Sequence, residues 1–112
     1  MNNMISIIND DIFVSATCQD ILATLARQFK KRRLEKGYSR LSLQSVTGVP
    51  APTIARFENI HKTSLESFVK LAMALGYQDE LASLFAEDKY FTMEEMETIK
   101  KNKNRQRGTR KC

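Results

Sequence analysis

Cysteine, proline, glycine and tryptophan are scarce in this chain of 112 residues, which has two, two, four and none of them respectively. So little glycine and proline excludes a collagen-like or low-complexity chain. Cys18 and Cys112 form neither a disulfide framework nor a paired metal-ligand spacing, which predicts free thiols in a reducing compartment. No apolar run approaches the roughly 18 residues of a membrane span. The sequence therefore predicts a cytoplasmic protein of one domain with tails and no membrane partner.

Motifs for catalysis, metal binding and cofactor binding are also missing. The chain has no glycine-rich phosphate loop, no nucleophile motif and no pair of carboxylates in a plausible pocket. His61 is the only histidine, and no cysteine lies near it in the sequence, so a metal site is not expected. We therefore predict a protein that is not an enzyme and that uses no cofactor.

Positive charge exceeds negative charge, with 18 Lys and Arg against 13 Asp and Glu. Residues 100–112 contain seven of the basic side chains and no acidic one, so residues 1–99 carry a net charge of −2. This excess in the tail makes a polyanion the first partner to consider. The tail is either a nonspecific attractor of DNA or a solvated end that aids partner docking, and both interpretations stay open. RNA is less favoured, because no aromatic side chain is interleaved with the charges.

Apolar residues recur at helical spacing, which predicts an all-α domain of about five short helices over residues 17–86. Residues 1–16 are expected to form an N-terminal arm, with a possible short strand within residues 1–14. Residues 87–112 are expected to form an acidic and then basic tail, flexible or ordered by a partner. The first helix starts at Thr17 and stops at Gly37. Its apolar face comprises Leu22, Leu25, Ala26 and Phe29.

Two short helices joined by a tight turn follow the first helix. Ser39 is a good N-cap for the second helix, which ends at Gly48. Pro50 and Pro52 suit the first positions of the third helix, where a missing backbone N–H costs nothing. This layout is typical of a helix-turn-helix unit, whose second helix enters the DNA major groove. The apolar residues that these two helices carry are Leu43, Val46, Ile54 and Phe57.

The remaining helices are marked by two capping-box patterns. Thr63 to Glu66 predicts the start of a fourth helix, which Gly76 ends. Residues 79–85 predict one more brief helix. Thr92 to Glu95 is the second capping box, ahead of a weakly amphipathic segment that can become ordered on a partner. The apolar positions are Leu65, Phe68, Leu71, Ala72 and Leu75 in the fourth helix, and Met93, Met96 and Ile99 in the last segment.

The stretch SRLSLQSVTGVPAPTIARFE, residues 39–58, resembles the core of the Cro/repressor (Xre) helix-turn-helix family. The likeness extends over about residues 20–77. Within that family, the run TIARFEN at residues 53–59, followed by Ser64 to Gly76, is most similar to HipB-type antitoxins. The resemblance implies a lambda-repressor-like fold and a homodimeric transcriptional repressor of its own operon. Its partners would be double-stranded operator DNA and a HipA-like kinase toxin.

The resemblance also implies which residues contact DNA. Thr53 can donate and accept hydrogen bonds, and Arg56 is the one side chain at this edge able to form a bidentate pair with guanine. Phosphate contacts are expected from the N-termini of the second and third helices and from nearby polar side chains. The predicted DNA-binding set is Ser39, Arg40, Pro50, Ala51, Pro52, Thr53, Arg56, Asn59 and Lys62.

Several residues depart from the family pattern. Arg40 stands where a glutamine usually clamps a phosphate. Gln44 replaces a small alanine, so either the two helices cross more loosely or Gln44 turns outward. The Pro50 to Pro52 edge lacks the long polar residues common in relatives, which predicts modest specificity and two half-sites read by a dimer. The expected dimer surface is the helix after Gly76 together with an end segment.

Arg33 and Glu58 match an ion pair that the family places between the first and third helices, where it acts as scaffolding. The alternative function is a protein-interaction module of the same fold, or a solitary or prophage regulator, with little sequence-specific DNA reading. The Pro-Ala-Pro edge is the feature that supports this alternative.

Overall fold

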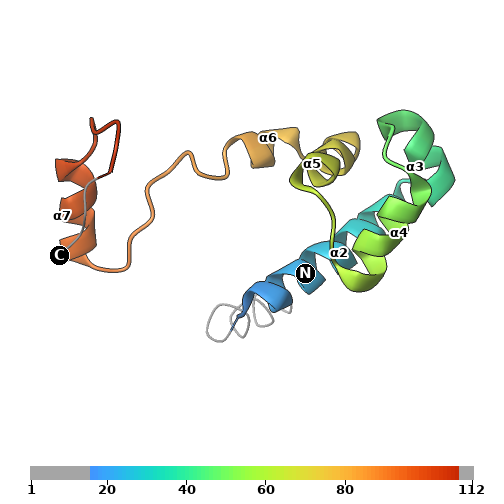
Figure 1. Ribbon diagram of the computed structural model, residues 1–112, viewed down its shortest axis with the longest axis horizontal. Coiled ribbons are helices and arrows are strands. Elements are labelled where there is room, and N and C mark those ends of the chain that lie inside the picture. The colour runs from blue at the N-terminus through green and yellow to red at the C-terminus, as the bar shows by residue number, and fades with distance from the viewer. Residues whose placement is uncertain (1–15, 109–112) are drawn as a thin grey trace. The chain divides into compact units, whose positions relative to one another are not determined.

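The computed structural model describes residues 16–108, and this part of the chain is built from helices without strands. The described residues contain six helices: five lie within residues 17–86, where about five were predicted, and the sixth lies in the predicted amphipathic segment of the tail. The predicted all-α, lambda-repressor-like fold class is confirmed. The predicted arm or strand within residues 1–14 lies outside the described residues. The helices are α2 (Cys18–Glu35), α3 (Arg40–Thr47), α4 (Ala51–Ile60), α5 (Leu65–Ala74), α6 (Gln78–Ala82) and α7 (Met93–Lys101) (Figure 1).

The chain divides into two compact units, residues 1–81 and residues 82–112. The first unit contains α2 to α5 and most of α6, and the second contains α7. The sequence-based domain boundary after residue 86 stays a prediction.

Reciprocal side-chain caps fix where α2 and α3 begin. The Thr17 hydroxyl accepts the Asp20 N–H at 3.2 Å, and the Asp20 carboxylate accepts the Thr17 N–H at 3.0 Å. Ser39 and Ser42 exchange the same two bonds at 2.9 Å each. Each box satisfies amides that a helix start otherwise leaves without partners. At the end of α3, Gly48 adopts the left-handed conformation with φ of 79°, where glycine has no Cβ penalty.

The core of the first unit is centred on Phe57 of α4. Helix α4 packs on α2 and α3, and α3 packs on α5. The Phe57 side chain is 2% exposed, and its ring makes edge contacts with Phe29 at 5.4 Å and Phe68 at 5.8 Å. One aromatic side chain therefore joins α2, α4 and α5. The buried apolar residues are Ala26, Phe29, Leu43, Val49, Ile54, Phe57, Leu71 and Leu75.

Five of the predicted apolar positions of this unit lie outside this core: Leu22 and Ala72 are half-buried, and Leu25, Val46 and Leu65 are exposed. Val46 is 59% exposed, because the inward position of the last turn of α3 belongs to Thr47. The Thr47 hydroxyl donates to the Leu43 carbonyl at 2.8 Å and accepts the Val49 N–H at 3.0 Å, which ties the turn to α3. Leu65 is 76% exposed, because it is the first residue of α5 and precedes the turns that reach the core.

The start of α5 differs from the predicted capping box by one residue. Ser64 is the N-cap, and its hydroxyl accepts the Ser67 N–H at 3.1 Å. The Thr63 hydroxyl is buried and has no hydrogen-bond partner. The sequence T-S offers two adjacent hydroxyl groups, and only the fold selects between them. The helix ends as predicted before Gly76, whose φ is 95°.

The second unit contains α7 and the segment that precedes it. Thr92 caps α7 by accepting the Glu95 N–H at 3.0 Å, as predicted. The Glu95 carboxylate accepts the Phe91 N–H at 2.6 Å instead of the Thr92 N–H, so the predicted reciprocal box is only half formed. An ion pair between Lys103 and Asp88 at 2.6 Å holds the preceding segment against the end of α7. No residue among 82–108 is buried.

Candidate nucleic-acid interface

The turn between α3 and α4 is three residues long, from Gly48 to Pro50. Val49 is buried in this turn and anchors it to the core. Gly48 reverses the chain direction by its positive φ, and Pro50 starts α4 with its φ fixed at −60°. This short, anchored connection sets the angle at which α4 leaves α3, as a helix-turn-helix unit requires.

The start of α4 is capped across the turn by Gln44. Pro50 is the N-cap residue, and it has no side-chain acceptor for the first amides of the helix. The Gln44 Oε1 atom accepts the Ala51 N–H at 2.7 Å instead. Gln44 is half-buried and directed at α4, so it does not turn outward. The residue that departs from the family alanine thus joins the two helices.

This cap leaves the start of α4 without a free amide. The Ala51 N–H is bound by Gln44, and the Thr53 N–H donates to the Pro50 carbonyl at 2.9 Å. Pro52 has no N–H. The expected phosphate contact from the backbone of this helix start is therefore not supported. At the start of α3 the situation is the opposite, because the N–H groups of Arg40 and Leu41 have no partner within the described residues.

The outward face of α4 is formed by Pro52, Arg56 and Asn59, which follow one another at spacings of four and three residues. All three are exposed, whereas Ile54, Phe57 and Glu58 face the core. Within the part of the chain that the structure describes, the Arg56 side chain makes no hydrogen bond or ion pair. A cation in the middle of an exposed helix face is thus available to a ligand.

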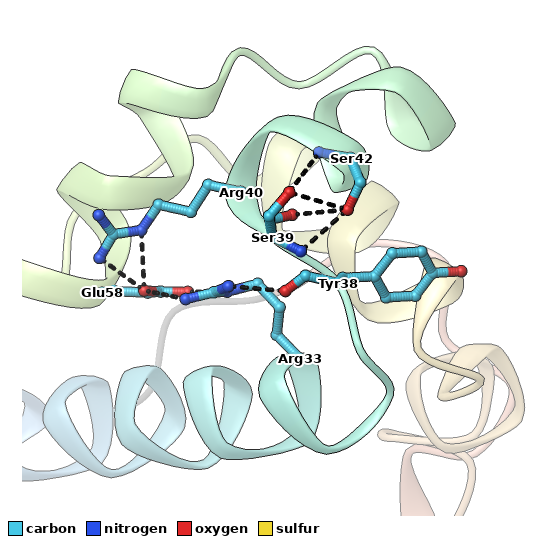
Figure 2. A network of polar contacts seen from close by, with 6 residues as sticks. All are labelled: Arg33, Tyr38, Ser39, Arg40, Ser42 and Glu58. Atoms are coloured by element: carbon cyan, nitrogen blue, oxygen red, sulfur yellow. Dashed lines mark hydrogen bonds and ion pairs between the residues drawn. The ribbon is translucent and has the colours of Figure 1, made fainter.

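A buried ion network lies behind this face and joins three helices (Figure 2). The Glu58 carboxylate of α4 accepts bonds from Arg33 of α2, with Nε at 2.6 Å and Nη2 at 3.0 Å. Arg40 of α3 donates to the same carboxylate from Nε at 3.1 Å and Nη2 at 2.9 Å. Arg33 Nη1 also donates to the Tyr38 carbonyl at 2.8 Å. The expected pair between Arg33 and Glu58 is confirmed, and Arg40 extends it.

Two guanidinium groups set the protonation of Glu58. Its side chain is fully buried, and burial alone would raise the pKa of the carboxyl group. Hydrogen bonds from Arg33 and Arg40, together with their charges, outweigh burial and lower the pKa below its usual value. Glu58 therefore stays ionised, and the cluster of two arginines and one glutamate keeps a net positive charge.

Arg40 is held in place by this network. Its side chain is about one third exposed, and both bonds to Glu58 use Nε and Nη2. The Nη1 group is left free of the network. Arg40 was predicted as a phosphate donor in the place of the family glutamine. Figure 2 shows its side chain extending from the start of α3 to Glu58 of α4, where the guanidinium is held.

The helical domain is basic without the C-terminal tail. Residues 17–77 contain ten basic and four acidic side chains, and residues 78–99 contain seven acidic side chains and one lysine. The positive charge of residues 17–77 and the negative charge of residues 78–99 cancel each other. The net charge of residues 1–99 therefore does not reveal that the domain is basic. Six of its cations are exposed and have no ion-pair partner within the described residues: Arg27, Lys30, Lys31, Lys36, Arg56 and Lys62.

The predicted contact residues are positioned in three ways. Ser39 caps α3 through its hydroxyl and its N–H, and Arg40 is half-buried on Glu58. Ala51 and Thr53 are half-buried in the first turn of α4. The exposed members of the set are Ser39, Pro50, Pro52, Arg56, Asn59 and Lys62. The set thus surrounds α4 and the start of α3, and its contact with DNA stays a prediction.

Sequence reasoning missed two residues that shape this surface. Glu58 was assigned to Arg33 alone, yet it also holds Arg40. Gln44 was noted only as a departure from the family, yet it caps α4. A signal for Gln44 was present, because a helix that starts with Pro50 needs an acceptor from elsewhere for its first amide.

The loop after α4 also has an unusual residue. His61 is the C-cap of α4 and has a φ of 66°, the left-handed conformation that glycine usually takes. His61 holds this conformation although it carries a side chain. Among the described residues, no group of three His, Cys, Asp or Glu side chains is placed to hold a metal ion.

The buried scaffold, the anchored turn and the exposed face of α4 give the first unit the layout of a helix-turn-helix domain. A family comparison agrees: residues 29–81 match the model of the helix-turn-helix family. No curated protein and no solved structure matches the chain. No helix among the described residues is long and apolar enough to cross a membrane.

Proposed function

We propose that this protein is a transcriptional repressor that binds its operator as a homodimer and reads DNA with α4. The observation that carries the proposal is Arg56, an exposed cation without a partner in the described structure, at the middle of the outward face of α4. Such a side chain suits a recognition helix, because a guanidinium can form a bidentate pair with guanine in the major groove. The basic surface of the domain supports the same proposal.

Specificity is expected to be modest. Arg56 supplies one bidentate contact, worth about 1–3 kcal/mol of discrimination. Pro52 and Ala51 offer only apolar contact, which suits a thymine methyl group. Thr53 is half-buried, so it can reach a base only from the edge of the helix. Two half-sites bound by a dimer would double this limited discrimination.

Phosphate binding is assigned to the start of α3 and to the residues after α4. The Arg40 Nη1 group makes no bond within the described residues, and neither do the N–H groups of Arg40 and Leu41. Asn59 and Lys62 are exposed at the other end of α4. Together these groups would hold the domain on the DNA backbone and orient α4 toward the bases.

The test is footprinting and quantitative binding on the promoter of the operon that encodes the protein. We expect protection of paired sites spaced by about one helical turn or a multiple of it. Arg56→Ala should weaken binding by about tenfold or more and relax the preference at one base position. Arg27→Ala is the matched control, because Arg27 is also an exposed arginine without a partner among residues 16–108, but lies on α2. Equal effects of the two changes would refute reading by Arg56.

A protein-interaction module of the same fold is the second candidate function. The occupied amide at the start of α4 and the apolar Pro-Ala-Pro edge favour it, because both reduce what this helix offers to DNA. In that case binding would be weak and indifferent to sequence, and deletion of residues 100–112 would remove it. Arg56→Ala would then have no effect on sequence preference.

The antitoxin role is a finer proposal, and its support is the resemblance of residues 53–59 and 64–76 to HipB-type antitoxins. It assigns a HipA-like kinase as the second partner. The reading frame next to the gene is the first observation to make. If it encodes a kinase-like protein, co-expression should suppress the toxicity of that protein, and the two chains should co-purify. A neighbour of another kind would favour a solitary or prophage regulator.

A further inference from the structure

The second unit exposes large apolar side chains that a stable protein normally covers. No residue among 82–108 is buried, and Phe85 and Phe91 are 92% and 99% exposed. A unit of about thirty residues cannot build a sufficient core alone, and oligomerisation is one common solution. Contiguous exposed apolar residues mark protein contacts. The exposed apolar side chains of this unit are Leu84, Phe85, Tyr90, Phe91 and Met93.

Charge along α7 is divided between its two ends. Glu94 and Glu95 lie in the first turn, Glu97 lies in the middle, and Lys100 and Lys101 lie in the last turn. Met96 and Ile99 are half-buried on the same helix, so α7 has an apolar side between its charged ends. An antiparallel neighbour of identical sequence would place its last-turn lysines opposite Glu94 and Glu95, and its first-turn glutamates opposite Lys100 and Lys101. A parallel copy would instead place like charges together.

We propose that the second unit is a dimerisation element in which α7 packs antiparallel against α7 of a second copy of this chain. The charge pattern of α7 is complementary to itself only in that orientation. An arrangement with twofold symmetry uses the same surface on both copies, as most dimers do. The inference deepens the proposed function, because a repressor that reads two half-sites needs two linked domains.

The aromatic segment before α7 has to contribute to the same interface. A helix of nine residues is only about 13 Å long, which is short for a stable helix pair. The ion pair between Asp88 and Lys103 holds the preceding segment close to α7. Phe91 and Met93 flank the N-cap of α7 and are exposed, so they can be covered by the second copy.

Sedimentation equilibrium of the full chain without DNA tests this proposal. The wild type should sediment at twice the chain mass of 12.9 kDa. Glu94→Lys with Glu97→Lys, and separately Lys100→Glu with Lys101→Glu, should each weaken association at least tenfold, because like charges then face each other. A one-to-one mixture of the two variants should form a heterodimer. Glu95 and Lys103 are left unchanged, because each has a partner within its own unit.

The control carries the same change of charge away from α7. Lys30→Glu with Lys31→Glu on α2 should leave the dimer intact, because both side chains are exposed on the first unit. A monomeric wild type, a dimer that survives both α7 variants, or a dimer lost in the α2 control would each overturn the proposal. Restored association in the mixture shows that the variants still fold.

The outcome is independent of DNA reading. A dimer that depends on α7 but does not bind the operator would support the dimerisation proposal and contradict the repressor function. A monomer that binds single half-sites in a manner dependent on Arg56 would do the reverse.

Discussion

The two units of this chain differ in how their apolar residues are used. In the first unit, eight apolar residues between Ala26 and Leu75 are buried around Phe57. In the second unit, residues of the same kinds are exposed, and none of the described ones is buried. The difference lies in long-range packing, because α2, α4 and α5 meet at one ring, whereas α7 has no such neighbour within its own unit. Stability of the single chain is therefore concentrated in the first unit.

The largest expected effect comes from removing the central ring. Phe57→Ala should lower the free energy of unfolding by about 3–5 kcal/mol, because it leaves a cavity where three helices meet. Phe91→Ala removes the same atoms from an exposed position and should change the free energy of unfolding by less than about 0.5 kcal/mol. Urea unfolding followed by circular dichroism measures both, at a concentration where the chain is monomeric. Similar losses in the two variants would contradict the comparison.

The next largest effect comes from the buried ion network of the first unit. Glu58→Gln should cost about 3 kcal/mol, because Arg33 stays buried without its counterion. Glu97→Gln in the second unit changes the same group at an exposed position and should have little effect on unfolding. The same urea experiment checks both variants. An unchanged midpoint for Glu58→Gln would show that the network adds nothing to stability.

The loss of stability at low pH should also differ between a buried and an exposed glutamate. The pKa of Glu58 is lower in the folded protein than in the unfolded chain, where it is about 4.3. Glu58 therefore contributes stability that is fully present above about pH 4.3 and is lost as the pH falls through the folded pKa. Glu58→Gln should flatten this part of the pH profile, and Glu97→Gln should leave it unchanged. Thermal unfolding between pH 7 and pH 2 makes the measurement.

The smallest expected effect concerns the end of α4. His61→Gly should stabilise the first unit by about 0.5 kcal/mol, because glycine accepts the left-handed conformation without strain, and the greater freedom of the unfolded chain offsets part of the gain. Lys36→Gly is the matched control, because Lys36 also follows a helix but has a φ of −84°. It should give no gain. A stabilised control would show that the effect does not arise from φ.

Features that depend on neighbours in the sequence were predictable. Ser39, Gly48 and Gly76 mark helix ends by local chemistry, and the structure confirms each. The burial of Ile54 and Phe57 followed from helical spacing. The exposure of Val46 and Leu65 could not be predicted in this way. Helical spacing identifies the apolar face of a helix, but tertiary packing decides how much of that face is covered.

The contacts of the candidate site were predictable only for residues that match the family pattern. The pair between Arg33 and Glu58 followed from the resemblance and is confirmed. The bonds of Arg40 to Glu58 and of Gln44 to Ala51 were not foreseen. Both involve residues that differ from the family, and both depend on distances set by the fold. The exposure of Arg56 agrees with a role in binding, which stays a proposal.

The bond from Ala51 to Gln44 makes one backbone proton a reporter of this interface. Amides at the first position of a helix normally exchange rapidly with solvent, because no carbonyl of the helix binds them. The Ala51 amide should exchange slowly for as long as α3 and α4 keep their mutual angle. Its exchange rate, followed by NMR as DNA is added, would therefore reveal whether docking bends the helix pair or leaves it rigid.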